Sequence, residues 1–147
     1  MYDEPAELIA SYEATLDTLG LLMGDASSEV VGGKGWTISE IVNHLLDTDT
    51  RFIGRVQRMR RENNPTMRIL PGPDYKKLSV LKAWKQFYDL RQRHVRLLRS
   101  LSPDEWNRPG VLPPVGDITI ASLTRHGAAH DATHIAQIAR RLSGRTA

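Results

Sequence analysis

Apolar residues recur at intervals of three and four along four separate stretches of this chain, and this spacing limits the fold more than any other feature. In residues 4–23 the recurring positions are Leu8, Tyr12, Leu16, Leu19 and Met23. Such positions share one face of an α-helix, whereas a half-buried strand needs a period of two, which the sequence does not sustain. Residues 4–23 are therefore predicted to form an amphipathic helix, and the polar, glycine-rich segment 25–35 is predicted to be a loop.

Three further helices are predicted from their start signals and apolar stripes. Thr37, followed three residues later by Glu40, is typical of a capping box and predicts a helix over residues 37–61. A serine cap opens a third helix at 79–100, and the last helix is expected from residue 118 or 119 to 142. The expected buried stripes are Ile38, Ile41, Leu45, Phe52, Val56 and Met59 in the second helix, and Leu81, Trp84, Tyr88, Val95 and Leu98 in the third.

The segments between these helices are rich in proline and glycine. Residues 62–78 contain three prolines and predict a long connection, compatible with a crossover between distant helix ends. Residues 102–105 predict one short extra helical turn, and residues 109–117 predict a loop. The fold class expected for residues 1–147 is therefore all-α, a single four-helix-bundle domain with a long connection between the second and third helices.

The composition excludes several classes of protein. The sequence has no cysteine, which excludes disulfides, cysteine-based zinc sites and a cysteine nucleophile. It shows no basic and apolar leader and no run of eighteen apolar residues, so we expect a cytoplasmic protein without a membrane span. The net charge of +3 hints at an anionic partner. The basic stretches 51–61 and 90–100 lack a helix-turn-helix or aromatic platform, so nucleic-acid binding is not expected.

Histidines placed four residues apart are the most informative chemical feature. His130 and His134 lie one turn apart on the last predicted helix and can direct their imidazoles at one metal ion. His44, on the flank of the second helix's apolar stripe, is the candidate third ligand. Three protein ligands leave one coordination position open, which is typical of a reactive site. The alternative is that these histidines are solvated or packed at a core edge.

Other polar side chains near these histidines are candidates for contact with the metal's surroundings or with a substrate. His126 extends the stripe but lies about 12 Å along the helix axis from His134, so it is assigned to a pocket or the surface. Gln137 shares the face of His134. Thr48, Arg51 and Arg55 share the flank of His44, and the arginines suit carboxylate groups, with a solvated helix face as the alternative. Weaker candidates are Asp47 and Asp131, as acceptors for imidazole N–H groups, and His94 is expected at the core edge.

Two of these motifs resemble those of a known family. Trp36, Thr37, Glu40, Ile41, His44 and Leu45 resemble the helix-two motif of the DinB-like family, and His130, His134 and Gln137 resemble its helix-four motif. The resemblance extends over residues 36–142. It implies a four-helix bundle that holds a divalent metal ion, frequently zinc or nickel, through His44, His130 and His134, and it implies that homodimers are common. Members of the family include S-transferases and isomerases that use mycothiol, bacillithiol or glutathione.

The expected function follows from the metal site and the resemblance together. A divalent ion lowers the pKa of a water or a thiol that ligates it. Because the chain has no cysteine, any thiolate must come from a low-molecular-weight cosubstrate. We therefore expect a metal-dependent thiol S-transferase acting on small electrophiles. A metal-dependent small-molecule hydrolase and a non-catalytic binding or dimerisation module remain the alternatives.

Overall fold

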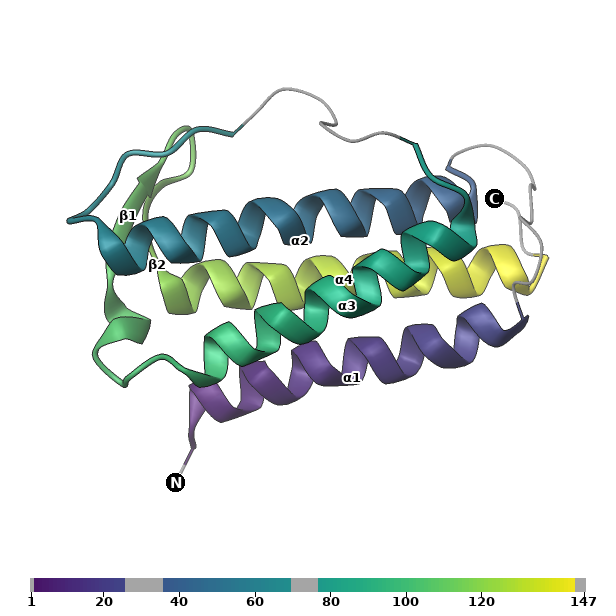
Figure 1. Ribbon diagram of the computed structural model, residues 1–147, viewed down its shortest axis with the longest axis horizontal. Helices are drawn as coiled ribbons and strands as arrows, with labels where there is room; N and C mark the ends of the chain where they lie inside the picture. The colour runs from purple at the N-terminus through teal and green to yellow at the C-terminus, as the bar shows by residue number, and fades with distance from the viewer. Residues whose placement is uncertain (1, 26–35, 70–76, 145–147) are drawn as a thin grey trace.

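A computed structural model describes residues 2–25, 36–69 and 77–144 of the chain. Within these ranges the α-helices are α1 (Glu4–Asp25), α2 (Ile38–Arg61), α3 (Val80–Arg99) and α4 (Ile120–Leu142), shown in Figure 1. The predicted four-helix bundle is confirmed, and the predicted helix ends lie within two residues of those observed. The predicted loop at 26–35 lies outside the described residues. None of the described helices is long and apolar enough to span a membrane.

Local capping interactions account for where the helices begin. Thr37 Oγ1 accepts a hydrogen bond from the Glu40 backbone N–H (3.1 Å), and Glu40 Oε1 accepts one from the Thr37 N–H (3.2 Å). Thr119 and Ser122 form the equivalent reciprocal pair at the start of α4. Each pair satisfies N–H groups that the first turn of a helix cannot pair internally. The starting points of α2 and α4 are thus set by residues close to them in sequence.

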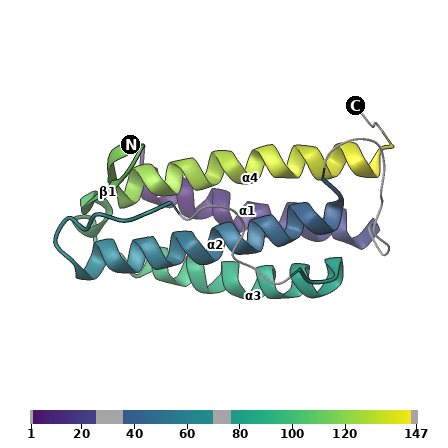
Figure 2. The same ribbon diagram turned by 90° about the horizontal axis from the view of Figure 1, so that it is seen from above.

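The helix directions explain the long second connection. α1 and α4 run in one direction and α2 and α3 in the other, as the colour gradient in Figure 1 shows. The main packing contacts of α1 and of α2 are with both α3 and α4, an arrangement that is also visible from above in Figure 2. Since α2 and α3 are parallel neighbours, the end of α2 and the start of α3 lie at opposite ends of the bundle, as a crossover requires. The predicted crossover is confirmed, although residues 70–76 lie outside the described part.

A β-hairpin covers one end of the bundle, where a loop was predicted. After the expected short turn, η1 (Glu105–Asn107), strand β1 (Pro109–Leu112) pairs antiparallel with β2 (Gly116–Thr119). The loop prediction for 109–117 was wrong because four-residue strands are too short for a period of two to be recognised. The hairpin also gains support from the α2–α3 connection, since the Met67 N–H donates to the Val111 carbonyl oxygen (2.8 Å).

The core confirms two predicted stripes and corrects the third. All the residues expected to be buried on α1 and α2 are buried. On α3, Val95 and Leu98 are buried as predicted, but Leu81 and Tyr88 are 56% and 41% exposed. The helix is rotated relative to the prediction, because its inner face includes polar residues that a hydrophobic pattern assigns to the surface. The buried residues of α3 are Val80, Ala83, Phe87, Arg91, His94, Val95 and Leu98.

The Arg91 side chain is the centre of a buried polar network. It is 2% exposed and bonds to Asp49 of α2 (2.9 Å) and Asp131 of α4 (2.8 Å). It also donates to the backbone carbonyl of Tyr12 in α1 (3.2 Å). His94, expected at the core edge, lies inside the core with Nδ1 3.0 Å from Asp49 Oδ1. Burial by itself raises the pKa of Asp49, but the Arg91 charge and the His94 hydrogen bond hold that pKa below its usual value.

We predict that Arg91→Ala destabilises the protein by about 3–5 kcal/mol, because it leaves two buried carboxylates without their counter-ion. Urea unfolding monitored by circular dichroism measures the change. Arg93→Ala on the exposed side of α3 is the matched control and should cost less than about 0.5 kcal/mol. Equal losses in the two variants would contradict the importance of the buried network.

Candidate metal centre

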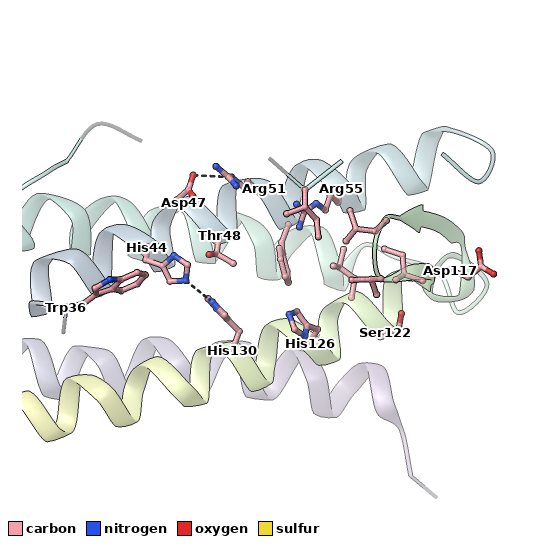
Figure 3. A pocket seen from close by; sticks show the side chains of 16 residues that line it. Trp36, His44, Asp47, Thr48, Arg51, Arg55, Asp117, Ser122, His126 and His130 are labelled. Atoms are coloured by element: carbon pink, nitrogen blue, oxygen red, sulfur yellow. Dashed lines mark hydrogen bonds and ion pairs between the residues drawn. The ribbon is translucent and has the colours of Figure 1, made fainter. Parts of the chain in front are cut away.

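Three histidines from two helices meet between α2 and α4. His44 Nε2 lies 2.9 Å from His130 Nε2, and His134 Nε2 lies 3.0 Å from the same atom. One ring nitrogen from each histidine lies within 4.8 Å of the others. Figure 3 shows His44 and His130 directed toward each other from the two helices. The structure thus brings together the three histidines that were predicted to share a metal ion.

The convergence follows from the helix geometry. His130 and His134 are one turn apart on α4, so their side chains lie on one face. That face meets α2, where His44 borders the buried stripe of Ile41 and Leu45. His134 is buried, with 8% of its surface exposed, while His44 and His130 are half-buried. The cluster therefore lies at the boundary between the core and an open space.

Gln137 and Trp36 orient the rings of the cluster. Gln137 Oε1 lies 2.7 Å from His134 Nδ1 and accepts a hydrogen bond from the Nδ1–H group, which leaves the lone pair of His134 on Nε2, the atom that faces His130. Gln137 therefore lies beside the cluster, as predicted. The Trp36 ring contacts the His44 ring edge-on (4.9 Å between centroids) and stacks on His134 (6.1 Å). The contact from Trp36 was not expected, although its place just before a capping box beside His44 could have indicated it.

The surroundings favour uncharged imidazoles. Burial, together with His134 and Arg51, lowers the pKa of His44 to about 4. Burial, together with His134 and His44, lowers the pKa of His130 to about 4. Both rings are therefore neutral near pH 7, and the neutral ring is the form that coordinates a metal.

The donor set fits a divalent transition metal ion. Imidazole nitrogens at ~2.0–2.1 Å from a tetrahedral zinc ion are about 3.3 Å apart, close to the two separations of 2.9 and 3.0 Å between the Nε2 atoms. Three imidazole nitrogens also suit nickel. Because three ligands converge among the residues that the structure describes, one position of a tetrahedral ion would stay open to a small molecule.

Two aspartates do not take the role suggested for them. Asp131 was a candidate acceptor for an imidazole N–H, but its carboxylate bonds to Arg91 and to Thr15 Oγ1 (2.9 Å). Asp47 forms an ion pair with Arg51 (3.3 Å), and no described contact joins it to a histidine. Asp131 does not contact the histidine cluster because residues 130 and 131 are adjacent and point to different faces of α4.

A cavity of about 690 Å³ extends from the histidines along α2 and α4 to the hairpin. Thr48, Arg51, Arg55 and His126 line it, together with His44 and His130, so the predicted flank residues do face a common space. Its other lining residues are Trp36, Asp47, Phe52, Ile69, Leu112, Val115, Asp117, Ile118, Ser122 and Leu123. The hairpin end is mainly apolar, and sequence reasoning missed it because its walls come from the segments read as loops.

His126 lies apart from the histidine cluster, as its helical spacing predicted. It is exposed, lines the cavity, and stacks against the Phe52 ring at 6.2 Å between centroids. Arg55 also packs over the Phe52 ring, with its guanidinium carbon 5.6 Å from the centre of the ring. The cavity thus offers two arginines and His126 to a ligand, in addition to the imidazoles of His44 and His130.

We predict that His44→Ala weakens zinc or nickel binding as severely as His130→Ala, by more than about 100-fold, because each removes one of three ligands. Competition against a chromophoric chelator and elemental analysis measure the affinity and the stoichiometry. His126→Ala is the control and should retain wild-type affinity. An undiminished affinity in His44→Ala would remove His44 from the site.

We also predict that the metal-free protein loses stability as the pH falls from about 7 to about 5. The unfolded chain binds protons at His44 and His130 near their usual pKa of about 6.5, whereas the folded chain, with pKa values of about 4, does not. Urea unfolding in the presence of a chelator measures this dependence. The double variant His44→Gln with His130→Gln should show a smaller loss, and an identical loss would rule out these two residues as its source.

Comparisons with known proteins identify a family and several relatives of this chain. The sequence model described as the DinB superfamily matches residues 6–138. A protein of Oceanobacillus iheyensis is 29% identical over 118 residues, 71% of this chain and 63% of that protein. A protein of Bacillus mycoides is 30% identical over 120 residues, 74% of this chain and 68% of that protein. Both are named "Putative metal-dependent hydrolase", and the match spans less than two thirds of the Oceanobacillus protein.

A solved structure supports the same fold. YfiT from Bacillus subtilis, described as "a probable metal-dependent hydrolase with an unusual four-helix bundle topology", superposes with a TM-score of 0.73. The superposition covers 97% of this chain and 90% of YfiT, at 22% sequence identity. Because the superfamily match extends over most of the bundle and includes all three clustered histidines, this chain belongs to the DinB superfamily.

Proposed function

We propose that this protein is a metal-dependent enzyme that transfers a low-molecular-weight thiol to a small electrophile. The observation that carries the proposal is the position of the histidine cluster, at one end of a cavity whose wall also presents Arg51 and Arg55. The cluster would hold the metal through His44, His130 and His134. When bound there, a divalent ion supplies the acidity that favours the thiolate form of a thiol.

The residues around the cluster support this chemistry by positioning. Gln137 keeps the lone pair of His134 on Nε2, and Trp36 covers one side of the His44 and His134 rings. The sequence contains no cysteine, so the sulfur nucleophile has to enter the cavity as part of a cosubstrate. The half-buried position of His44 and His130 leaves the cluster accessible from the cavity.

The cavity wall fits such a cosubstrate and its acceptor. Arg51 and Arg55 line the cavity with guanidinium groups, which bind carboxylates with two hydrogen bonds, and glutathione and bacillithiol carry carboxylates. Beyond the arginines, Leu112, Val115 and Ile118 form an apolar end that suits the hydrophobic part of an electrophile. The two substrates would thus lie along one cavity, with sulfur at the histidine end.

Hydrolysis of a small molecule is the second candidate, favoured by two observations. Both named relatives are described as metal-dependent hydrolases. In addition, His126 is exposed in the cavity, one helical turn from His130, where its imidazole could accept a proton from an attacking water. In this reaction water replaces the thiol, and the arginines would hold an anionic substrate.

We predict turnover of monochlorobimane by the zinc- or nickel-loaded protein with one physiological thiol, and none without a thiol. A panel of glutathione, bacillithiol, mycothiol and coenzyme A, monitored by fluorescence, identifies the cosubstrate. His44→Ala should abolish turnover. Arg55→Gln should raise the KM for the thiol about tenfold or more with a smaller effect on kcat, because it removes a charge-assisted hydrogen bond to the thiol.

Arg93→Gln, on the exposed face of α3, is the matched control for the loss of one arginine and should leave both kinetic constants unchanged. Metal-dependent cleavage of ester or amide substrates without any thiol would replace the transferase by the hydrolase. Full metal occupancy with neither activity would indicate a binding module.

A further inference from the structure

A second hollow lies beside the main cavity, where the last turns of α2 meet the start of the α2–α3 connection. This arginine groove, of about 530 Å³, is lined by Arg51, Gly54, Arg55, Gln57, Arg58, Arg61, Thr66, Met67 and Arg68. Arg51 and Arg55 belong to both hollows. The two hollows therefore share the part of their walls that these two arginines form.

The lining residues carry an unusual concentration of positive charge. Five of them are arginines and none is acidic. Arg51 pairs with Asp47 and Arg58 pairs with Glu62, both of which lie outside the lining. Arg61 and Arg68 are exposed, and no hydrogen bond or ion pair joins their side chains to the described part of the chain. Like charges held this closely repel one another unless an anion lies between them.

The helix geometry keeps the groove open. Positions 51, 55 and 58 are separated by four and three residues, and positions 54, 58 and 61 likewise, so the five residues share one face of α2. At the centre of this face Gly54 has no side chain, and a Cβ built there would meet no atom within 4 Å. The missing side chain leaves room for a ligand between the guanidinium groups of successive turns.

We propose that the arginine groove binds the multiply charged end of a small anionic molecule, either a phosphate group or paired carboxylates. Guanidinium groups bind both kinds of oxyanion with two parallel hydrogen bonds, and several converging arginines suit a group with more than one negative charge. The groove is distinct from the histidine cluster, and anion binding in it needs neither metal nor thiol. It therefore goes beyond the proposed reaction.

The features of the groove favour a small molecule over a nucleic acid. Its lining has no aromatic side chain on which a base could stack, and stacking supplies much of the affinity of single-stranded nucleic acids. The positive charge is local, because the whole chain carries a net charge of only +3. The groove does not provide the extended basic surface that the phosphate backbone of a duplex requires.

Isothermal titration calorimetry with inorganic pyrophosphate and with malate tests the proposal. One site per chain is expected for at least one of these probes. The double variant Arg61→Gln with Arg68→Gln should bind it at least tenfold more weakly. Arg93→Gln with Arg96→Gln removes two exposed arginines from α3 and is the matched control for net charge, so its affinity should equal that of the wild type.

A second pair of variants tests the position of the ligand. Gly54→Glu introduces a carboxylate among the arginines and should abolish binding of the probe, whereas Gly54→Ala adds only a methyl group in open space and should leave binding intact. The same titration on His44→Ala should give wild-type affinity, which separates the groove from any anion held at the metal centre.

Three results would overturn the proposal. The first is that the two double-arginine variants weaken the affinity for the probe equally. The second is that His44→Ala no longer binds the probe, and the third is that neither probe binds the wild-type protein. Displacement of a bound probe by a short DNA or RNA duplex, with an affinity that falls steeply as salt rises, would instead assign the groove to nucleic acid. None of these results would decide whether the protein transfers thiols.

Discussion

The structure depends on one buried cation, the guanidinium of Arg91, which contacts residues from all the other helices of the bundle. A charge removed from water is costly, and here the cost is offset by carboxylates from α2 and α4 and by the ring of Tyr12, whose centre lies 4.4 Å from the guanidinium carbon. Both carboxylates and the guanidinium must be in place together, because the loss of any one of them would leave a buried charge without its full set of counter-charges. The network therefore favours one arrangement of the helices over any other in which the apolar stripes could pack.

The same network determines where the histidines meet. Asp131 is the next residue after His130, and Asp49 lies little more than one turn from His44 on α2. Since both carboxylates bond to one guanidinium, α2 and α4 cannot slide along each other without breaking these bonds. The buried charges thus hold in position two helices whose imidazoles form the candidate metal centre.

The parts of the fold that depend on local signals were predictable from the sequence. Thr37 with Glu40 marks the start of α2, and the three-and-four spacing of α1 and α2 identifies their buried faces. The pairing of His130 with His134 follows from one helical turn, while the choice of His44 relied on its place beside an apolar stripe and on a family resemblance. These inferences needed only neighbouring residues or a recognised motif.

Features that depend on distant partners were not predictable in this way. The inner face of α3 contains Arg91 and His94, which become acceptable in the core only because Asp49 lies opposite them on another helix. The hairpin depends on backbone bonds to the connection more than forty residues earlier, between Met67 and Val111. The apolar end of the cavity is formed by the same segments, so its shape could not be read from any single stretch of sequence.

This division of the cavity between helices and connecting segments has a consequence for how the protein can diversify. The histidine end is built on two helices anchored in the core, whereas the opposite end includes a short hairpin and part of the α2–α3 connection. Substitutions and length changes in such peripheral segments alter little of the packed interior. Descendants of this chain could therefore come to bind different small molecules by exchanging one wall, while inheriting the histidine cluster of the other unchanged.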